Sequence, residues 1–410
     1  MPYIVVPTYN PTSAYRPIIW HTFAISPDPV EVAVCGVYVG GVFQAFMYLS
    51  PFLNVGNNYF FRFDVQSIMQ NFLAPKAQQK TTVFGTLGAQ YSALNPDCFD
   101  DVSLEVTYLY RDPTTNKLVD LGISDASTVD DVVLMTRQHQ QDQDPSNYVA
   151  GFGLGAPFLT NAPDGQEICL DESLFISLLP GGANAFQVRT FDSAGAQVDV
   201  GIFSAPVNSG NDQASFGIGC NEIRNTTFDL FGSVNIDNPA VAYYQIVAGA
   251  YGAPFFFFYT EVRRYYISEC CDDSVRLHFL NLLGGADAYT FKSKAVRSIS
   301  ANSDLAQKPL GYDITQFTPH SIEDKGGFKL NVDAVESYQL ESQYLDIESA
   351  NWLSELLVSA EVYEETANGL VPVIVSDVTQ DLETNDSNGV QLVRFNITVL
   401  KANSIIAHRN

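Results

Sequence analysis

The chain has 410 residues, enough for two or three domains, and 46% of them are hydrophobic, which excludes a disordered chain. Its 46 acidic residues outnumber its 21 basic ones, and the net charge of −25 argues against nucleic acid or a membrane surface as a partner. Charged residues make up only 16% of the chain, a composition that suits extended β surfaces and contacts between subunits.

No apolar run reaches the ~18 residues needed to cross a bilayer, and the first residues lack the pattern of a signal peptide. We therefore expect synthesis in a reducing cytoplasm, where the six cysteines, which lack CxxC spacing, would be reduced core residues. A strained disulfide between the adjacent Cys270 and Cys271 is the alternative.

Residues 1–140 are expected to form a β-sandwich-like domain with one helix. Residues 30–37 and 102–110 are rich in β-branched and aromatic side chains, which favours strands. After Asp64, a good N-cap, apolar residues recur at helical spacing. This pattern predicts a helix that ends at Pro75.

The next block, residues 146–305, is again sized for a β-sandwich-like domain. A polar stretch without periodicity, residues 138–145, is expected to be the linker before it, and residues 298–308 form a weaker break after it. The glycines of residues 151–157 superficially resemble a phosphate loop. Their spacing does not fit GxGxxG and Pro157 excludes a following helix, so the start of a strand is the preferred interpretation.

The second block contains the run Phe255, Phe256, Phe257 and Phe258, followed by Tyr259. Successive side chains of a strand point to opposite faces, so a single core cannot cover all four phenylalanines. Either this is a central strand covered on both sides within the chain, or another domain or subunit covers one face. We take these five residues as candidate interaction residues.

Residues 306–410 are expected to form a smaller α+β domain. Within it, residues 347–358 carry an apolar stripe at helical spacing, which predicts a helix packed on a sheet. Asn368 and Gly369 predict a hairpin with a type I′ turn, and residues 390–400 predict a strand. The chain as a whole thus predicts a mainly β fold, with two β-sandwich-like domains followed by the α+β domain.

No motif combines a nucleophile, a base and a group that orients the base. The five histidines lack the spacing of metal ligands, and His278, in a β-rich segment, is expected to be structural. Pairs of neighbouring aspartates could serve a glycosidase, but solvated loops explain them better in so acidic a chain. These pairs are Asp100-Asp101, Asp130-Asp131 and Asp272-Asp273. Residues 381–389 are oxygen-rich enough for calcium but lack the EF-hand order, so a hairpin turn is preferred. We expect no enzymatic activity, no cofactor and no metal site.

Residues 276–291 contain the stretch Asn-x-x-Gly-Gly-x-Asp-x-Tyr-Thr-Phe between two predicted strands. This pattern resembles one in uncharacterised virion proteins of tailed bacteriophages that infect Bacteroidetes. Four further segments are similar to other parts of these proteins: residues 15–19, 63–68, 352–363 and 371–375. The resemblance implies a β-rich component of the tail, neck or baseplate, and it implies no catalytic residue.

Within the same stretch, Asn281, Gly284, Gly285 and Asp287 are expected to form a structural turn. The two glycines permit positive φ, and the Asn281 and Asp287 side chains can bond backbone amides. We therefore expect these residues to shape the chain rather than to bind a ligand.

Taken with the resemblance, these features predict a structural subunit of a bacteriophage particle, in its tail, neck or baseplate. It would be assembled in the host cytoplasm and act as a homo-oligomer that docks to other virion proteins. A capsid decoration or head-fibre protein is one alternative, and a carbohydrate-binding adhesin module is another, although no sequence feature supports a bound glycan. A polysaccharide hydrolase ranks third.

Overall fold

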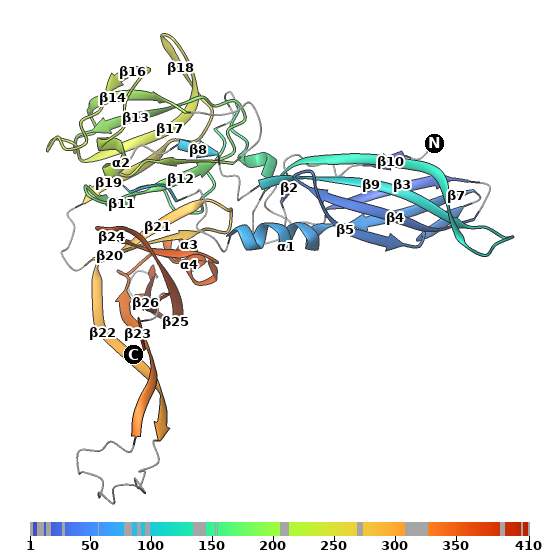
Figure 1. Cartoon of the computed structure of the whole chain (residues 1–410). Coiled ribbons are helices and arrows are strands. Elements are labelled where there is room, and N and C mark those ends of the chain that lie inside the picture. Colours follow the sequence, from blue (N-terminus) through green and yellow to red (C-terminus); the bar gives the residue numbers. More distant parts are fainter. Residues whose placement is uncertain are drawn as a thin grey trace, which may run out of the picture. The chain divides into compact units, whose positions relative to one another are not determined.

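The computed structural model describes residues 3–5, 12–13, 18–26, 29–55, 57–77, 84–87, 92–94, 99–133, 145–151, 153, 155–205, 213–268, 274–307, 327–385, 390–402 and 405–408. The fold is mainly β, as the sequence predicts, with several sheets and a few short helices (Figure 1). The chain divides into two compact units. The first comprises Met1–Cys270, His278–Ala288 and Val358–Glu361, and the second comprises Cys271–Leu277, Tyr289–Leu357 and Val362–Asn410. Among the described residues, no helix has the length and apolar character needed to cross a membrane.

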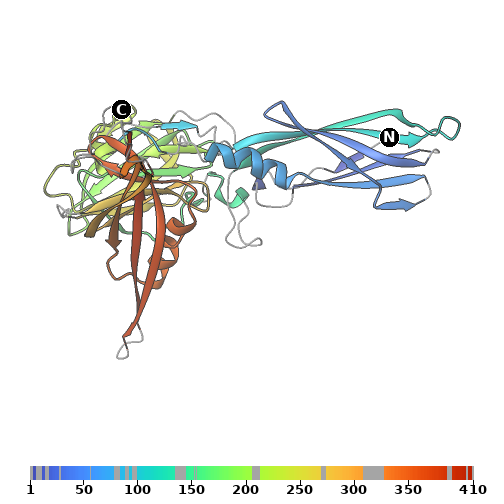
Figure 2. The ribbon, with the colours of Figure 1, turned by 60° about the horizontal axis from the view of Figure 1, so that its bottom comes forward.

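The first unit begins with a β-sandwich of two sheets, with strand orders β1-β3-β7-β6 and β2-β10-β9-β4-β5 (Figures 1 and 2). Its strands are β1 (Tyr3–Val5), β2 (Thr12–Ser13), β3 (Ile19–Ile25), β4 (Val30–Val39), β5 (Val42–Leu49), β6 (Leu53–Val55), β7 (Asn58–Asp64), β9 (Phe99–Arg111) and β10 (Leu118–Val133). Buried side chains alternate along β9, where Leu104, Val106 and Tyr108 face the core. The ring of Tyr108 lies 5.5 Å from the ring of Phe61 on β7, so the two sheets pack face to face.

Helix α1 (Gln66–Ala77) follows β7, where the sequence predicts a helix. The carboxylate of Asp64 accepts a hydrogen bond from the backbone N–H of Gln66 over 3.0 Å, as expected of a capping residue. Met69 is buried on the apolar side of the helix. The predicted end at Pro75 is wrong, because the helix continues beyond it. Proline has no backbone N–H and therefore removes one hydrogen bond of the helix. Because Pro75 lies in the last turn, few further hydrogen bonds of the helix come after it.

Two of the described cysteines, Cys35 and Cys220, are buried and form no disulfide, as predicted. The prediction of a reduced thiol is wrong for Cys169, which is disulfide-bonded. Spacing along a sequence does not show which cysteines a fold brings together, and this is why the disulfide was not predicted.

The Cys35 thiol should resist alkylation in the native protein. Burial in the N-terminal sandwich raises its pKa to about 12, so almost no thiolate is present at neutral pH. Because an unfolded cysteine ionises near pH ~8.5, rising pH above that value should also favour the unfolded state. Mass spectrometry after iodoacetamide treatment should find Cys35 unmodified in the native protein and modified in denaturant. Rapid native labelling would contradict the burial.

The second sandwich of the first unit, called here the middle sandwich, combines a seven-stranded and a three-stranded sheet. The strand orders are β11-β19-β17-β13-β14-β16, with β18 paired to β17, and β12-β15-β8. Its elements are β8 (Ser92–Leu94), η1 (Pro145–Tyr148), β11 (Gln166–Cys169), β12 (Phe175–Leu178), β13 (Ala185–Phe191), β14 (Gln197–Ser204), β15 (Ala214–Gly217), α2 (Cys220–Arg224), β16 (Phe231–Ser233), β17 (Tyr243–Gly252), β18 (Phe255–Phe258) and β19 (Arg263–Ser268). Strand β8 lies far from the others in sequence, yet Leu94 pairs with Ala214 of β15.

Phe186 lies at the centre of the middle sandwich's core. Its ring centroid is 4.2 Å from that of Phe216 on β15 and 5.6 Å from that of Phe203 on β14. Phe216 belongs to the three-stranded sheet, so this contact joins the two sheets. Along β13 and β17, the core side chains are Phe186, Val188, Tyr244, Ile246 and Ala248. Even-numbered residues of these strands therefore face the core, and odd-numbered residues face outward.

An eight-stranded sheet of order β21-β20-β24-β25-β26-β23-β22, with β27 paired to β23, contains the later strands. Its strands are β20 (Val275–Leu280), β21 (Ala286–Phe291), β22 (Ser293–Gln307), β23 (Gly327–Glu341), β24 (Val362–Thr366), β25 (Gly369–Asn385), β26 (Val390–Lys401) and β27 (Ile405–His408). Residues 298–307, which were expected to belong to a break, are strand and pair with β23. The predicted domain limits near residues 140 and 305 stay predictions.

The helix predicted over residues 347–358 is present as α3 (Ile347–Leu353) and α4 (Glu355–Val358). The carboxylate of Asp346 caps α3 by accepting a hydrogen bond from the backbone N–H of Ser349 over 2.8 Å. The buried Trp352 on α3 meets the ring of Tyr289 edge-on at 6.1 Å. Ser354 lies between the two helices. Its backbone N–H keeps the helical hydrogen bond to the carbonyl oxygen of Ala350 over 3.0 Å, and its hydroxyl donates to the carbonyl oxygen of Asn351.

The hairpin predicted at Asn368 and Gly369 is present, because Thr366 of β24 pairs with Gly369 of β25. A type I′ turn needs positive φ at both central residues, which here are Ala367 and Asn368. Positive φ occurs instead at Gly369, with φ 115°. The predicted turn type is therefore wrong, and the glycine lies one position after the centre of the turn.

Candidate interaction surfaces of the first unit

Strand β18 presents the phenylalanine run at the end of a hairpin. It pairs antiparallel with the second half of β17, from Gly249 opposite Phe258 to Gly252 opposite Phe255. Phe255, Phe257 and Phe258 are 65%, 42% and 41% exposed, and Phe256 is partly buried. The alternative of a central strand covered on both sides within the chain is therefore wrong.

The four rings lie on two sides of the hairpin. Phe256 and Phe258 share one side, with ring centroids 5.6 Å apart, and alternation places Phe255 and Phe257 on the other. The guanidinium of Arg189 lies over the Phe258 ring, 5.1 Å from its centroid. Phe256 and Phe258 thus extend the outward face of β13 and β17. Tyr259 follows the run, and its backbone N–H bonds the carbonyl oxygen of Ala248.

Two rows of side chains cross β13, β17 and β19 on this outward face. Strand pairing sets Arg189 beside Gln245 and Gln245 beside Arg264 in one row. The neighbouring row contains Phe191, Tyr243 and Tyr266. We call these six residues, together with Phe256 and Phe258, the arginine–aromatic face.

The aromatic row of this face is closely packed. The rings of Phe191 and Tyr243 stack at 4.9 Å with an interplanar angle of 7°, and Tyr266 lies 5.5 Å from Tyr243. The Arg264 guanidinium lies 5.0 Å from the Tyr243 ring centroid. Each arginine of the face thus lies over an aromatic ring, a favourable cation–π arrangement.

Both arginines bond neutral oxygen atoms. Nε of Arg189 donates to Oε1 of Gln187 over 2.7 Å, and Nη1 of Arg264 donates to the Tyr266 hydroxyl over 3.2 Å. Burial lowers the pKa of Arg189 from its ordinary value. The hydrogen bond with Tyr266 is the largest influence on the pKa of Arg264 and raises it.

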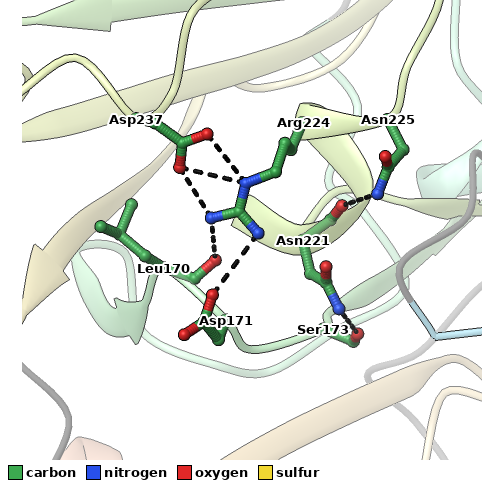
Figure 3. A network of polar contacts seen from close by, with 7 residues as sticks. All are labelled: Leu170, Asp171, Ser173, Asn221, Arg224, Asn225 and Asp237. Carbon is green, nitrogen blue, oxygen red and sulfur yellow. Dashed lines mark hydrogen bonds and ion pairs between the residues drawn. The ribbon is translucent and has the colours of Figure 1, made fainter.

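Arg224 shows how a paired arginine is held elsewhere on the same sandwich (Figure 3). At the end of α2, its guanidinium contacts both carboxylate oxygens of Asp237 at 2.7–3.0 Å and Asp171 at 3.5 Å. It also donates to the carbonyl oxygen of Leu170 over 3.1 Å. This bidentate pairing occupies most of its donors, so we assign Arg224 a structural role.

A second exposed aromatic surface lies on β5, the edge strand of its sheet in the N-terminal sandwich. Phe46 and Tyr48 are 58% and 66% exposed. Phe43 lies 4.6 Å from Phe46 between ring centroids and 5.6 Å from Tyr38 on the neighbouring strand β4. The Tyr38 hydroxyl donates to the exposed carboxylate of Glu105 over 2.9 Å. We call these five residues the β5 surface.

The β5 surface was not predicted from the sequence. Residues 42–49 are apolar at nearly every position, which is the same signal that singled out the phenylalanine run. Applying the alternation argument to this segment would have found it.

The predicted turn is organised by Asn281. Its Oδ1 accepts hydrogen bonds from the backbone N–H groups of Leu283 and Gly285 at 3.0 and 2.8 Å, and its Nδ2 donates to the carbonyl oxygen of Leu159 over 2.7 Å. Gly284 has the expected positive φ, 78°. Asp287 accepts a hydrogen bond from the Thr160 hydroxyl over 2.6 Å.

Gly285 is required for a different reason than predicted, because its φ is not positive. A Cβ at this position would overlap the carbonyl oxygen of Leu159. The glycine therefore permits a close approach of two backbones, not an unusual φ.

The structure also places several other residues that the sequence analysis considered. His278 is buried between the rings of Phe84 and Phe175, in keeping with a structural histidine. Ala156, in the glycine-rich segment, forms a parallel bridge with Thr260. No group of three His, Cys, Asp or Glu side chains among the described residues could hold a metal ion. Residues 138–144, Asp272, Asp273 and residues 386–389 lie outside the described residues.

Comparison with known proteins gives no family for the chain. No protein-family model and no curated protein match it. A solved structure that is similar is a marsupial T cell receptor, with 6% sequence identity over 100% of this chain and 99% of that chain and a TM-score of 0.17. This TM-score is too low for the similarity to carry an argument about fold or function.

Proposed function

We propose that the chain is a self-associating structural subunit of a bacteriophage particle, located in the tail, neck or baseplate. The observation that carries self-association is the exposure of the phenylalanine run on β18 in the single chain. Exposed rings of this kind are unfavourable in water and are stabilised when another surface covers them. The bacteriophage setting comes from the sequence resemblance.

The β5 surface supports the same proposal. Side chains with exposed rings lie along an edge strand, where unpaired backbone groups can also meet another chain. Two separate exposed apolar surfaces allow each copy to contact more than one neighbour. In this proposal the neighbours are further copies and other virion proteins, and the chain has no catalytic role.

The proposal is tested by replacing the two sides of β18 separately. Phe256→Ser with Phe258→Ser should weaken self-association, because burying a phenylalanine contributes about 1.5–3 kcal/mol and two of them therefore contribute about a hundredfold or more. Phe255→Ser with Phe257→Ser is the control, because these rings lie on the opposite side from the arginine–aromatic face. Sedimentation velocity over a range of concentrations measures association, and circular dichroism measures folding.

Three results would count against the proposal. A wild-type protein that stays monomeric at high concentration would remove self-association altogether. Two double variants that unfold alike would show that the rings belong to a core. Association that neither double variant changes would separate the rings from assembly and would favour the alternative of a carbohydrate-binding adhesin, which a glycan array would then test.

A further inference from the structure

Two arginines of the middle sandwich, Arg189 and Arg264, form no side-chain ion pair with a described residue, although the chain has 46 acidic residues and 21 basic ones. Arg111 and Arg394, like Arg224, pair with glutamate or aspartate. Arg189 is partly buried, and the one acceptor that its guanidinium has within the described ranges is the neutral Gln187. Arg264 is more exposed, and the nearby Asp164 carboxylate accepts a hydrogen bond from its backbone N–H over 2.7 Å, not from its guanidinium. A partly desolvated guanidinium with neutral acceptors alone is stabilised when a carboxylate reaches it.

The two arginines lie in one row on the outward face of the sheet. Gln245 lies between the two arginines in the same row, and the aromatic row runs beside it. Nε of Arg264 is buried and has no acceptor among the described residues. Arginine and tyrosine are the residues that dominate binding energy in protein interfaces, so this composition fits a protein partner.

The β5 surface has the complementary chemistry. Its exposed rings can cover the rings of the arginine–aromatic face. Its exposed carboxylate, that of Glu105, is opposite in charge to the two arginines of the other surface. Tyr38 and Phe46 flank Gly36, whose Cβ would lie 3.4 Å from the Tyr38 ring and 3.7 Å from the Phe46 ring. Gly36 is buried because these two rings cover it, so the rings themselves form the surface that a partner would meet.

We propose that the arginine–aromatic face of one copy binds the β5 surface of a second copy, with Glu105 of the second copy against the Arg189–Arg264 pair. This inference rests on the proposed self-association and names the two surfaces that carry it. The two surfaces differ, so the contact is heterologous and repeats from copy to copy, which builds a ring or a filament.

A charge exchange tests the inference. One variant carries Arg189→Glu and Arg264→Glu, and the other carries Glu105→Arg. Each alone sets like charges against each other in every such contact, so its self-association should weaken by at least about tenfold. Mixed together, the two variants set opposite charges against each other in both directions, so the mixture should associate again. Lys117→Glu, at an exposed position before β10, is the control for a reversed charge outside both surfaces, and it should leave association unchanged.

Sedimentation equilibrium of the full chain, alone and in equimolar mixture, gives the dissociation constants, and circular dichroism confirms that each variant is folded. Wild-type association should also weaken between about 0.1 and about 1 M sodium chloride, as the Debye length falls from ~10 to ~3 Å. A wild-type protein that does not associate defeats the proposed function itself. Wild-type association that persists in both variants, or a mixture that associates no better than its components, overturns this inference alone. Glycan binding that the Arg189→Glu, Arg264→Glu variant loses would also overturn it, because the face would then be a carbohydrate site.

Discussion

Replacing Asn281 with alanine should lower the free energy of unfolding by about 3–5 kcal/mol, because three buried hydrogen bonds are lost at once. The variant leaves the backbone N–H groups of Leu283 and Gly285 and the carbonyl oxygen of Leu159 without the partner they have now. Asn281 is 2% exposed, so water cannot easily replace the amide. Each buried polar group that loses its partner costs about 1–3 kcal/mol.

Asn225→Ala provides the control for this experiment. Asn225 is exposed, and its Nδ2 donates to the carbonyl oxygen of Asn221 over 2.9 Å, so its loss should cost about 1 kcal/mol or less. Urea unfolding followed by far-ultraviolet circular dichroism compares the two variants with the wild type. A similar small loss for both would show that the glycines alone hold the turn, and that Asn281 contributes little.

The strands were predictable where composition and alternation agree. The segment of residues 102–110 carries apolar side chains at alternate positions, and it lies in β9. Local signals also located the start of α1, because a capping aspartate acts on the next few residues. The ends of the helices were harder to predict than their starts. Pro75 lies within α1, and Ser354 divides the second helix, since the packing around a helix decides whether one unfavourable residue ends it.

The candidate surfaces were predictable only in part. The phenylalanine run could be found from the sequence, because no strand can bury four successive rings on one face. The other residues of the arginine–aromatic face could not be predicted, because only the register of β13, β17 and β19 brings Arg189 and Arg264 into one row, with Gln245 between them. Tertiary pairing of this kind leaves no local pattern in a single sequence. The same limit explains the disulfide at Cys169.

Phe186→Ala and Phe191→Ala remove the same side chain from the same strand, yet they should differ widely in their effect on folding. Phe186 contacts the rings of Phe203 and Phe216 and is 1% exposed, so its loss should cost about 3–5 kcal/mol. Phe191 is partly exposed and stacks on Tyr243 at the surface, so its loss should cost about 1.5 kcal/mol or less.

The variant with the larger effect should be the other one when self-association is measured instead of folding stability. Phe191 belongs to the arginine–aromatic face, so its loss should weaken self-association while shifting the urea midpoint much less than the loss of Phe186 does. Phe186 faces the core, so its loss should shift the midpoint strongly, and any effect on association should follow from unfolding alone. Equal costs of folding for the two variants would show that the outward face of β13 is already covered in the single chain. In that case the aromatic row would give no reason to expect a partner. The alternation along β13 would then show only that the chain buries both faces of this strand in its own core.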